Sequence, residues 1–140
     1  MAEIPKLSGP SLAPASGGKA DQVIMYLHGV GADGNDLIGL APHFQQVLPD
    51  AFLVSPDAPN PYDMAPTGRQ WFPIGDFTAE SRLEGVVSAA PILDAFIDET
   101  LADQGLGADR LLLIGFSQGT MMSLHVGLRR EAPVAGIIGH

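Results

Sequence analysis

A serine between two glycines stands where it could act as a nucleophile. The stretch GFSQG places Gly115, Ser117 and Gly119 in a G-x-S-x-G pattern, after the apolar run LLLI at 111–114 and before a helix-like segment at 118–130. Between a buried strand and a helix, this spacing is typical of a nucleophile elbow, a tight turn that exposes the serine. A side chain on either glycine would clash in such a turn. The helix dipole and free backbone N–H groups favour developing negative charge there, which suits acyl transfer.

A second glycine-rich stretch, HGVGADG at 28–34, follows the apolar run at 23–27 and spells G-x-G-x-x-G. This is the pattern of a dinucleotide-binding turn, and Asp57 lies near where a ribose-binding acid is expected. However, Asp33 and Asp36 lie where a pyrophosphate needs positive potential. We expect the helix cap at Asn35 or Asp36, after the motif rather than inside it. A dinucleotide-binding oxidoreductase therefore remains only as an alternative.

The same loop has a better interpretation as part of an oxyanion hole. An acyl-transfer serine needs two backbone N–H groups for the tetrahedral oxyanion, one from the residue after the nucleophile and one from a loop after an earlier strand. Here these donors are the N–H groups of Gln118 and Val30. Glycines beside Val30 let the backbone approach the substrate oxygen closely.

Apolar runs and helical periodicity alternate along the chain, which indicates an α/β fold with a mostly parallel sheet and helices on both faces. Strands are expected at 22–27, 51–55, 110–116 and 134–140, and helices at 36–48, 81–104 and 118–130. Residues 1–21 are rich in Pro, Gly and Ser and are expected to be extended, with part of them in a hairpin at a sheet edge.

Several residues are expected to shape the helices. Pro42 should kink its helix or end it early, Pro91 should bend the second helix, and Gly105 can end that helix. Ser81 and Glu84 have the spacing of a capping box. Both glycine-rich loops leave the carboxyl ends of strands, so they should meet on one rim of the sheet.

Composition excludes several classes of protein. A chain of 140 residues with 46% hydrophobic and 16% charged residues predicts one compact domain over 1–140. The formal net charge of −9 disfavours nucleic acids and anionic membranes. Without cysteines, disulfides and thiolate metal sites are excluded, and Asp33, Asn35 and Asp36 lack the further ligands of a calcium loop. No metal is therefore expected. No signal peptide and no membrane-inserting segment is recognisable, so a cytoplasmic protein is expected.

Four segments in order, LHGVGADGNDLIGLA, SPDAPNP, GRQWFPIGD and LLLIGFSQGTMMSLHVGL, resemble the phospholipase/carboxylesterase family of α/β-hydrolases, which includes the acyl-protein thioesterases. The resemblance implies a serine esterase that hydrolyses small-molecule carboxylic esters or thioesters through an acyl-enzyme, without a cofactor. It implies Ser117 as the nucleophile and the amides of Val30 and Gln118 as oxyanion donors. Trp71 and Phe72 either border the acyl pocket or merely anchor their loop over the sheet.

The acid and the base of a catalytic triad are not evident. The family order is Ser, Asp, His, yet the 23 residues after Ser117 contain no Asp. The sequence is therefore expected to be the N-terminal portion of an α/β-hydrolase, truncated before its last strands, with a His–Asp pair beyond residue 140. The apolar strand at 134–140 should be covered by continuing sequence or by a second chain. A non-catalytic, hydrolase-like binding module is a further alternative.

The four histidines are weak candidates for the base. His125 lies eight residues along the helix from Ser117, about 12 Å away, and is expected to pack. His43 is expected at the surface, and the resemblance makes His28 structural. His28 belongs to the oxyanion loop near the serine, and His140 closes the last strand within reach of the active rim, although the resemblance does not place the triad histidine there.

Overall fold

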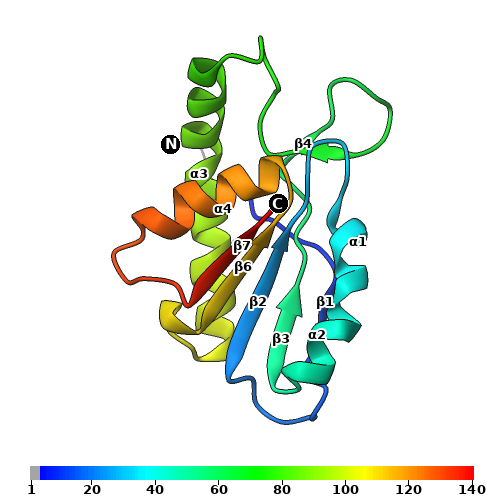
Figure 1. Cartoon of the computed structure of the whole chain (residues 1–140), viewed down its shortest axis with the longest axis vertical. Coiled ribbons are helices and arrows are strands. Elements are labelled where there is room, and N and C mark those ends of the chain that lie inside the picture. The colour runs from blue at the N-terminus through cyan, green and yellow to red at the C-terminus, as the bar shows by residue number, and fades with distance from the viewer. Residues whose placement is uncertain (1–3) are drawn as a thin grey trace.

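A computed structural model describes residues 4–140, which form a five-stranded sheet in the order β1-β3-β2-β6-β7 (Figure 1). The strands are β1 (Ser11–Leu12), β2 (Gln22–Leu27), β3 (Ala51–Val54), β6 (Leu111–Gly115) and β7 (Gly136–Gly139). β2, β3, β6 and β7 run parallel, and β1 pairs antiparallel with β3. The chain leaves β2 to one side and returns to its other side as β6. The carboxyl ends of β2 and β6 thus flank a topological switch point, where such sheets bind ligands.

Helices cover both faces of this sheet, as predicted (Figure 1). On one face lie α1 (Gly34–Leu37), the 3₁₀ turn η1 (Ile38–Leu40) and α2 (Ala41–Val47). On the other lie α3 (Ala79–Gln104) and α4 (Gln118–Arg129), and the 3₁₀ turn η2 (Ala108–Arg110) precedes β6. A small antiparallel pair, β4 (Asn60–Pro61) and β5 (Arg69–Gln70), lies in the long loop before α3.

Alternate residues of β2 contribute to two separate hydrophobic cores, because successive side chains of a strand point to opposite faces of the sheet. Val23, Met25 and Leu27 pack with residues of α3 and α4. Ile24 and Tyr26 pack with residues of α2 and β3. All five side chains are buried, which explains why the strand is apolar without alternation.

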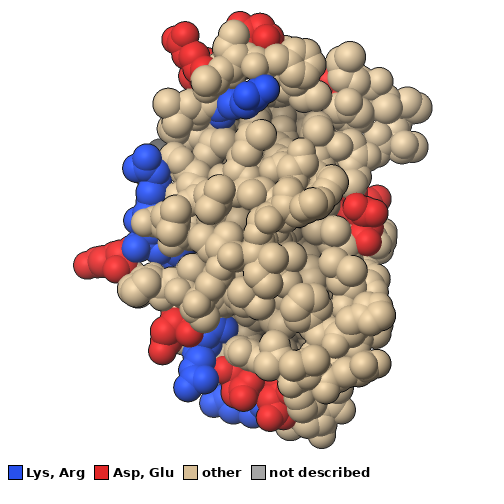
Figure 2. Space-filling view, viewed as in Figure 1, with Lys and Arg blue, Asp and Glu red and all other residues tan. Residues whose placement is uncertain are grey.

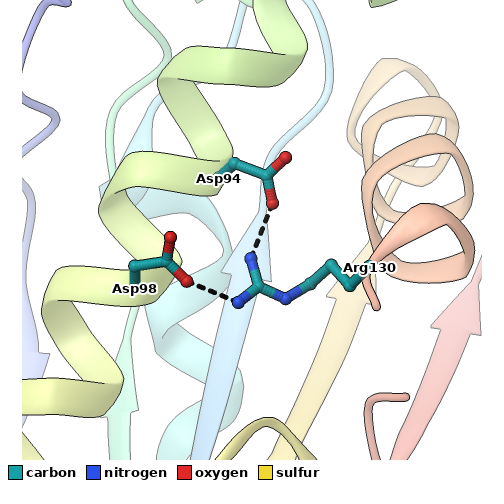
Figure 3. A network of polar contacts seen from close by, with 3 residues as sticks. All are labelled: Asp94, Asp98 and Arg130. Atoms are coloured by element: carbon teal, nitrogen blue, oxygen red, sulfur yellow. Dashed lines mark hydrogen bonds and ion pairs between the residues drawn. The ribbon is translucent and has the colours of Figure 1, made fainter. Parts of the chain in front are cut away.

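A polar clamp joins the two helices that share a face (Figure 3). Arg130, just after α4, donates hydrogen bonds to Asp94 at 2.6 Å and to Asp98 at 2.5 Å, both on α3. The two carboxylates are four residues apart and so lie on one side of α3. The clamp fixes the C-terminal end of α4, and hence the axis of the helix that begins beside Ser117.

The expected strands are confirmed, with ends shorter by one or two residues at 51–55, 110–116 and 134–140. The N-terminal segment joins the sheet edge through β1, but it pairs with β3 and not in a hairpin with β2. Residues 1–3 of that segment lie outside the described residues.

The helix expected at 36–48 is wrong as a single element, since α1, η1 and α2 follow one another there. Pro42 lies in the first turn of α2, where its missing N–H costs no helical hydrogen bond. The cap is Asp33, which accepts a hydrogen bond from the N–H of Asn35 at 2.9 Å, and not Asn35 or Asp36.

The cap of α3 also differs from the expectation. Thr78 Oγ1 accepts from the N–H of Ser81 at 3.0 Å, so Ser81 is the third residue of the capped turn and the Ser81–Glu84 box is wrong. Pro91 lies inside α3, which continues beyond it. Gly105 ends the helix with φ 69°, as predicted, because the left-handed region favours glycine.

Candidate active site

Ser117 stands between the end of β6 and the start of α4, in the turn that the sequence predicts. Its backbone has φ 53° and ψ −113°, which is unusual for a residue with a side chain, and its side chain is exposed. Strain of this kind occurs where the surrounding structure holds a functional residue in place. The turn therefore presents the hydroxyl at the N-terminus of α4.

The glycines around Ser117 are required by close backbone packing. A Cβ on Gly119 would lie 1.9 Å from the carbonyl oxygen of Leu27, at the end of β2. A Cβ on Gly115 would lie 2.6 Å from the carbonyl oxygen of Gly119. Neither neighbour can move away, because both are main-chain atoms. The absence of side chains here brings the serine turn against the end of β2, where the loop at 28–34 begins.

That loop is held in shape by the short strand β5. The N–H of Gly31 donates to Arg69 O and the N–H of Arg69 donates to Ala32 O, both at 2.7 Å. Gly31 adopts φ 86°, which only glycine enters without strain. The guanidinium of Arg69 in turn donates to the carbonyls of Ala58 and Pro59 at 2.9 and 3.0 Å. The backbone around Val30 is thus fixed from outside the loop.

The structure brings the nucleophile candidate and both oxyanion-donor candidates to one cavity of about 170 Å³. Its lining residues come from the two glycine-rich loops, the segment at 72–77 and the starts of α3 and α4: Val30, Phe72, Ile74, Phe77, Arg82, Ser117, Gln118 and Met121. Within residues 4–140, the backbone N–H groups of Val30 and Gln118 have no hydrogen-bond partner. Both amides are therefore available to an oxygen atom in the cavity.

Phe72 and Trp71 have different places. Phe72 lines the cavity, whereas Trp71 is buried and is not part of the lining. The indole N–H of Trp71 donates to the carbonyl of His28 at 2.9 Å, and the two rings pack with centroids 5.6 Å apart. This geometry corresponds to the anchoring alternative for Trp71, while Phe72 can touch a bound molecule.

The side chain of Gln118 has a second role that the sequence did not predict. Its Oε1 atom accepts from the N–H of Trp71, and its Nε2 atom donates to the carbonyl of Phe72, both at 2.7 Å. The carboxamide thus bonds to the main chain of Trp71 and Phe72 in the way that a neighbouring strand would. Neither of these two residues belongs to a strand. A polar residue at a buried position beside the serine is the signal that could have revealed it.

His28 is a structural residue in this geometry. It is fully buried; Nδ1 donates to the carbonyl of Gly29 at 2.7 Å and Nε2 accepts from the N–H of Ala58 at 2.9 Å. Both ring nitrogens are therefore occupied. Burial lowers the pKa of His28 from its ordinary value, which keeps the ring neutral.

The other histidines make no hydrogen bond with the Ser117 side chain in the described part of the chain. His140 accepts from the Ser117 N–H through its carbonyl at 2.7 Å, and its ring lies 5.6 Å from that of Phe116. His125 lies on α4, where partial burial and then the nearby Arg129 lower its pKa. His43 is exposed on α2, as expected.

The first turn of α1 argues against a dinucleotide. Asp57 Oδ1 accepts from the N–H of Gly34 at 2.7 Å, so a carboxylate of the chain occupies the position that a pyrophosphate would need. The expectation that the helix begins after the glycine motif is wrong, since α1 begins at Gly34 itself.

Residues 4–140 contain no group of three His, Cys, Asp or Glu side chains arranged for a metal ion. Among the described helices, none has the length and apolarity to cross a membrane.

Comparison with known proteins identifies the family of the chain. The model of the phospholipase/carboxylesterase family matches residues 13–140. The chain belongs to this family. The resemblance noted from the four sequence segments is thus confirmed, and so is the α/β-hydrolase fold.

Relatives in the phospholipase/carboxylesterase family are longer than this chain. Acyl-protein thioesterase 1 of Schizosaccharomyces pombe is 33% identical over 125 residues, which cover 84% of the chain and 54% of the relative. Esterase YpfH of Escherichia coli is 33% identical over 105 residues, covering 75% of the chain and 45% of the relative. The crystal structure of esterase PE8 superposes with a TM-score of 0.90 at 42% identity, covering 96% of the chain and 64% of that structure. The chain spans about half the length of the curated relatives it matches.

Proposed function

We propose that the protein is a serine carboxylesterase that hydrolyses carboxylic esters or thioesters through an acyl-enzyme on Ser117. The observation that carries the proposal is the shared cavity, which joins an exposed serine in a strained turn to two unpaired backbone N–H groups. Esterases and a thioesterase among the relatives support the same reaction class.

In the proposed reaction, Ser117 Oγ attacks the carbonyl carbon of the substrate while a base takes the hydroxyl proton. The carbonyl oxygen becomes an oxyanion, which the N–H groups of Val30 and Gln118 stabilise. The tetrahedral intermediate collapses, and the alcohol or thiol leaves with the proton returned by the base. Water then attacks the acyl-enzyme in the same way and releases the carboxylic acid.

The amides are well suited to this task because they are fixed before the substrate arrives. The loop of Val30 is held by Arg69, and the turn of Gln118 is held by Gly119 against β2. Donors that need not reorganise stabilise charge more than mobile ones, and one such donor contributes about 3 kcal/mol to catalysis. These contacts support Ser117 as the nucleophile of the proposal and the amides of Val30 and Gln118 as its oxyanion donors.

The base is the part that these residues do not supply. No imidazole within residues 4–140 hydrogen-bonds with Ser117 Oγ, and His28 has both nitrogens engaged. We assign the base and its orienting acid to sequence beyond residue 140, since the match covers only 54% and 45% of these two relatives. Such sequence would also cover β7, whose Ile138 is 51% exposed.

Hydrolysis by the complete protein tests this proposal. We expect turnover of p-nitrophenyl butyrate or of a butyryl thioester, and we expect Ser117→Ala to lower kcat by at least about a thousandfold. Ser88→Ala, on the exposed side of α3, is the control and should retain activity. Equal activity of Ser117→Ala would contradict the proposal. Acyl-ligand binding without turnover would favour a binding module, and a change in nicotinamide or flavin fluorescence would favour a dinucleotide enzyme.

A further inference from the structure

A second and larger hollow of about 460 Å³ lies between α3 and α4, and the esterase reaction makes no use of it. This volume is in the range of about 300–1,000 Å³ that is typical of small-molecule sites. We call it the α3–α4 groove, and define it by its lining residues: Arg82, Leu83, Val86, Met121, Leu124, His125, Leu128 and Arg129.

The groove exposes apolar side chains in a continuous row. On α4, Met121, Leu124 and Leu128 recur at helical spacing and are 37, 46 and 73% exposed. On α3, Leu83 is 57% exposed. From Met121 to Leu128 the row extends about 10 Å at the helical rise. A row of this length can cover an extended alkyl chain, whereas scattered surface leucines would not.

The charges of the groove are all cationic. Arg82 and Arg129 are among its lining residues, and no Asp or Glu is. Neither guanidinium forms an ion pair within residues 4–140, although Lys6 and Arg130 do. On a chain with a formal net charge of −9, an apolar groove with two unpaired arginines is complementary to an anionic ligand.

The groove also meets the Ser117 cavity. Arg82 and Met121 line both hollows, so they form the boundary between them. Figure 2 shows the face that carries α4 with mainly uncharged side chains over the helix and with Lys and Arg side chains toward its margin. Arg82 lies where the groove meets the Ser117 cavity, and Arg129 follows Leu128 at the end of α4, so an arginine lies near each end of the apolar row.

We propose that the α3–α4 groove is a binding site for an anionic amphiphile, whose alkyl chain lies along Met121, Leu124 and Leu128 and whose carboxylate pairs with Arg82 or Arg129. The site adjoins the Ser117 cavity at Arg82 and Met121, but binding there requires no turnover at Ser117. The apolar row supplies most of the affinity, at about 0.8 kcal/mol for each methylene buried. The arginines discriminate the sign of the head group.

Binding of dodecanoate, below micelle-forming concentrations, tests the site by calorimetry and by backbone NMR shifts. We expect saturable binding with shifts at Leu83, Leu124 and Leu128, at least tenfold tighter than binding of dodecyltrimethylammonium. Leu124→Glu should weaken it at least tenfold, because it places a carboxylate against the alkyl chain. The exposed Val47→Glu on α2 is the matched control and should bind as the parent does. Ser117→Ala should also bind unchanged, which separates this test from that of the esterase proposal.

The charge argument has its own control. Arg82→Glu and Arg129→Glu together should abolish the preference for the anionic probe, whereas Arg110→Glu, exposed before β6, should leave it. Equal affinity for the two head groups, shifts elsewhere on the surface, or no saturable binding would overturn the proposal. A concentration-dependent dimer whose interface buries Leu124 would overturn it too, because a second copy would then occupy the groove.

Discussion

The side chain of Gln118 and the backbone of Trp71, 47 residues apart in the sequence, are joined by a hydrogen bond of 2.7 Å. Through this bond and its companion to the carbonyl of Phe72, the residue after the nucleophile holds the segment that forms one wall of the Ser117 cavity. The nucleophile turn and the cavity wall are therefore one unit.

Gln118→Met tests this unit. The methionine fills a similar volume but leaves the N–H of Trp71 and the carbonyl of Phe72 buried without partners, at a cost of about 1–3 kcal/mol each. We expect a lower free energy of unfolding and faster hydrogen exchange of the Trp71 amide. The exposed Gln46→Met on α2 should change neither quantity. Unchanged exchange at Trp71 would show that other contacts hold the segment.

Gly119→Ala tests the packing of the turn against β2. Its Cβ would lie 1.9 Å from the carbonyl oxygen of Leu27, so the backbone must shift. We expect the free energy of unfolding in urea to fall by about 1–3 kcal/mol. Gly39→Ala, which has nothing within 4 Å of its added Cβ, should be neutral or slightly stabilising. If both substitutions behaved alike, the close approach would not be a constraint.

His28 should make stability depend on pH. Burial lowers its pKa in the folded chain below the ordinary value of 6.5, so the unfolded chain binds more protons as the pH falls through that value. The free energy of unfolding should therefore decrease as the pH falls from about 7 to about 5. His28→Gln should reduce this slope although it lowers stability overall, and His43→Gln should keep it. Stability that rose on acidification would contradict the neutral, buried ring.

The Arg130 clamp should contribute a modest and salt-dependent part of the stability. Asp94 and Asp98 are 45 and 67% exposed, and exposed pairs contribute about 0.2–1 kcal/mol each. We expect Arg130→Ala to cost about 1–2 kcal/mol in thermal unfolding at low salt, and less at high salt. Asp94→Ala should have little further effect in the Arg130→Ala background. Additive effects would mean that the two side chains act independently.

The sheet and the nucleophile turn were predictable because their signals are local. β2 and β6 are short apolar runs, which is what a strand covered on both faces requires. The G-x-S-x-G pattern between strand and helix predicted the position of Ser117. Glycine is needed at 119 because a side chain there would clash with the carbonyl oxygen of Leu27. These features depend on neighbours in the sequence.

The caps and clamps were not predictable because they depend on the path of the chain in space. Asp33 and Thr78 cap their helices, although polar residues just after them fit the same patterns. Arg130 stands beside Arg129 at the end of the helix-like segment 118–130, where nothing local indicates that it pairs across to α3. The i, i+4 spacing of Asp94 and Asp98 was the one local sign of a cationic partner.

The most direct test of the esterase proposal is the reaction of the natural protein with a fluorophosphonate, followed by tryptic digestion and mass spectrometry. The proposal predicts a phosphonyl adduct on the peptide 111–129, localised to Ser117 and absent in Ser117→Ala. A chain that leaves this peptide unmodified, while a reference serine esterase in the same tube is labelled, would contradict an activated nucleophile at Ser117.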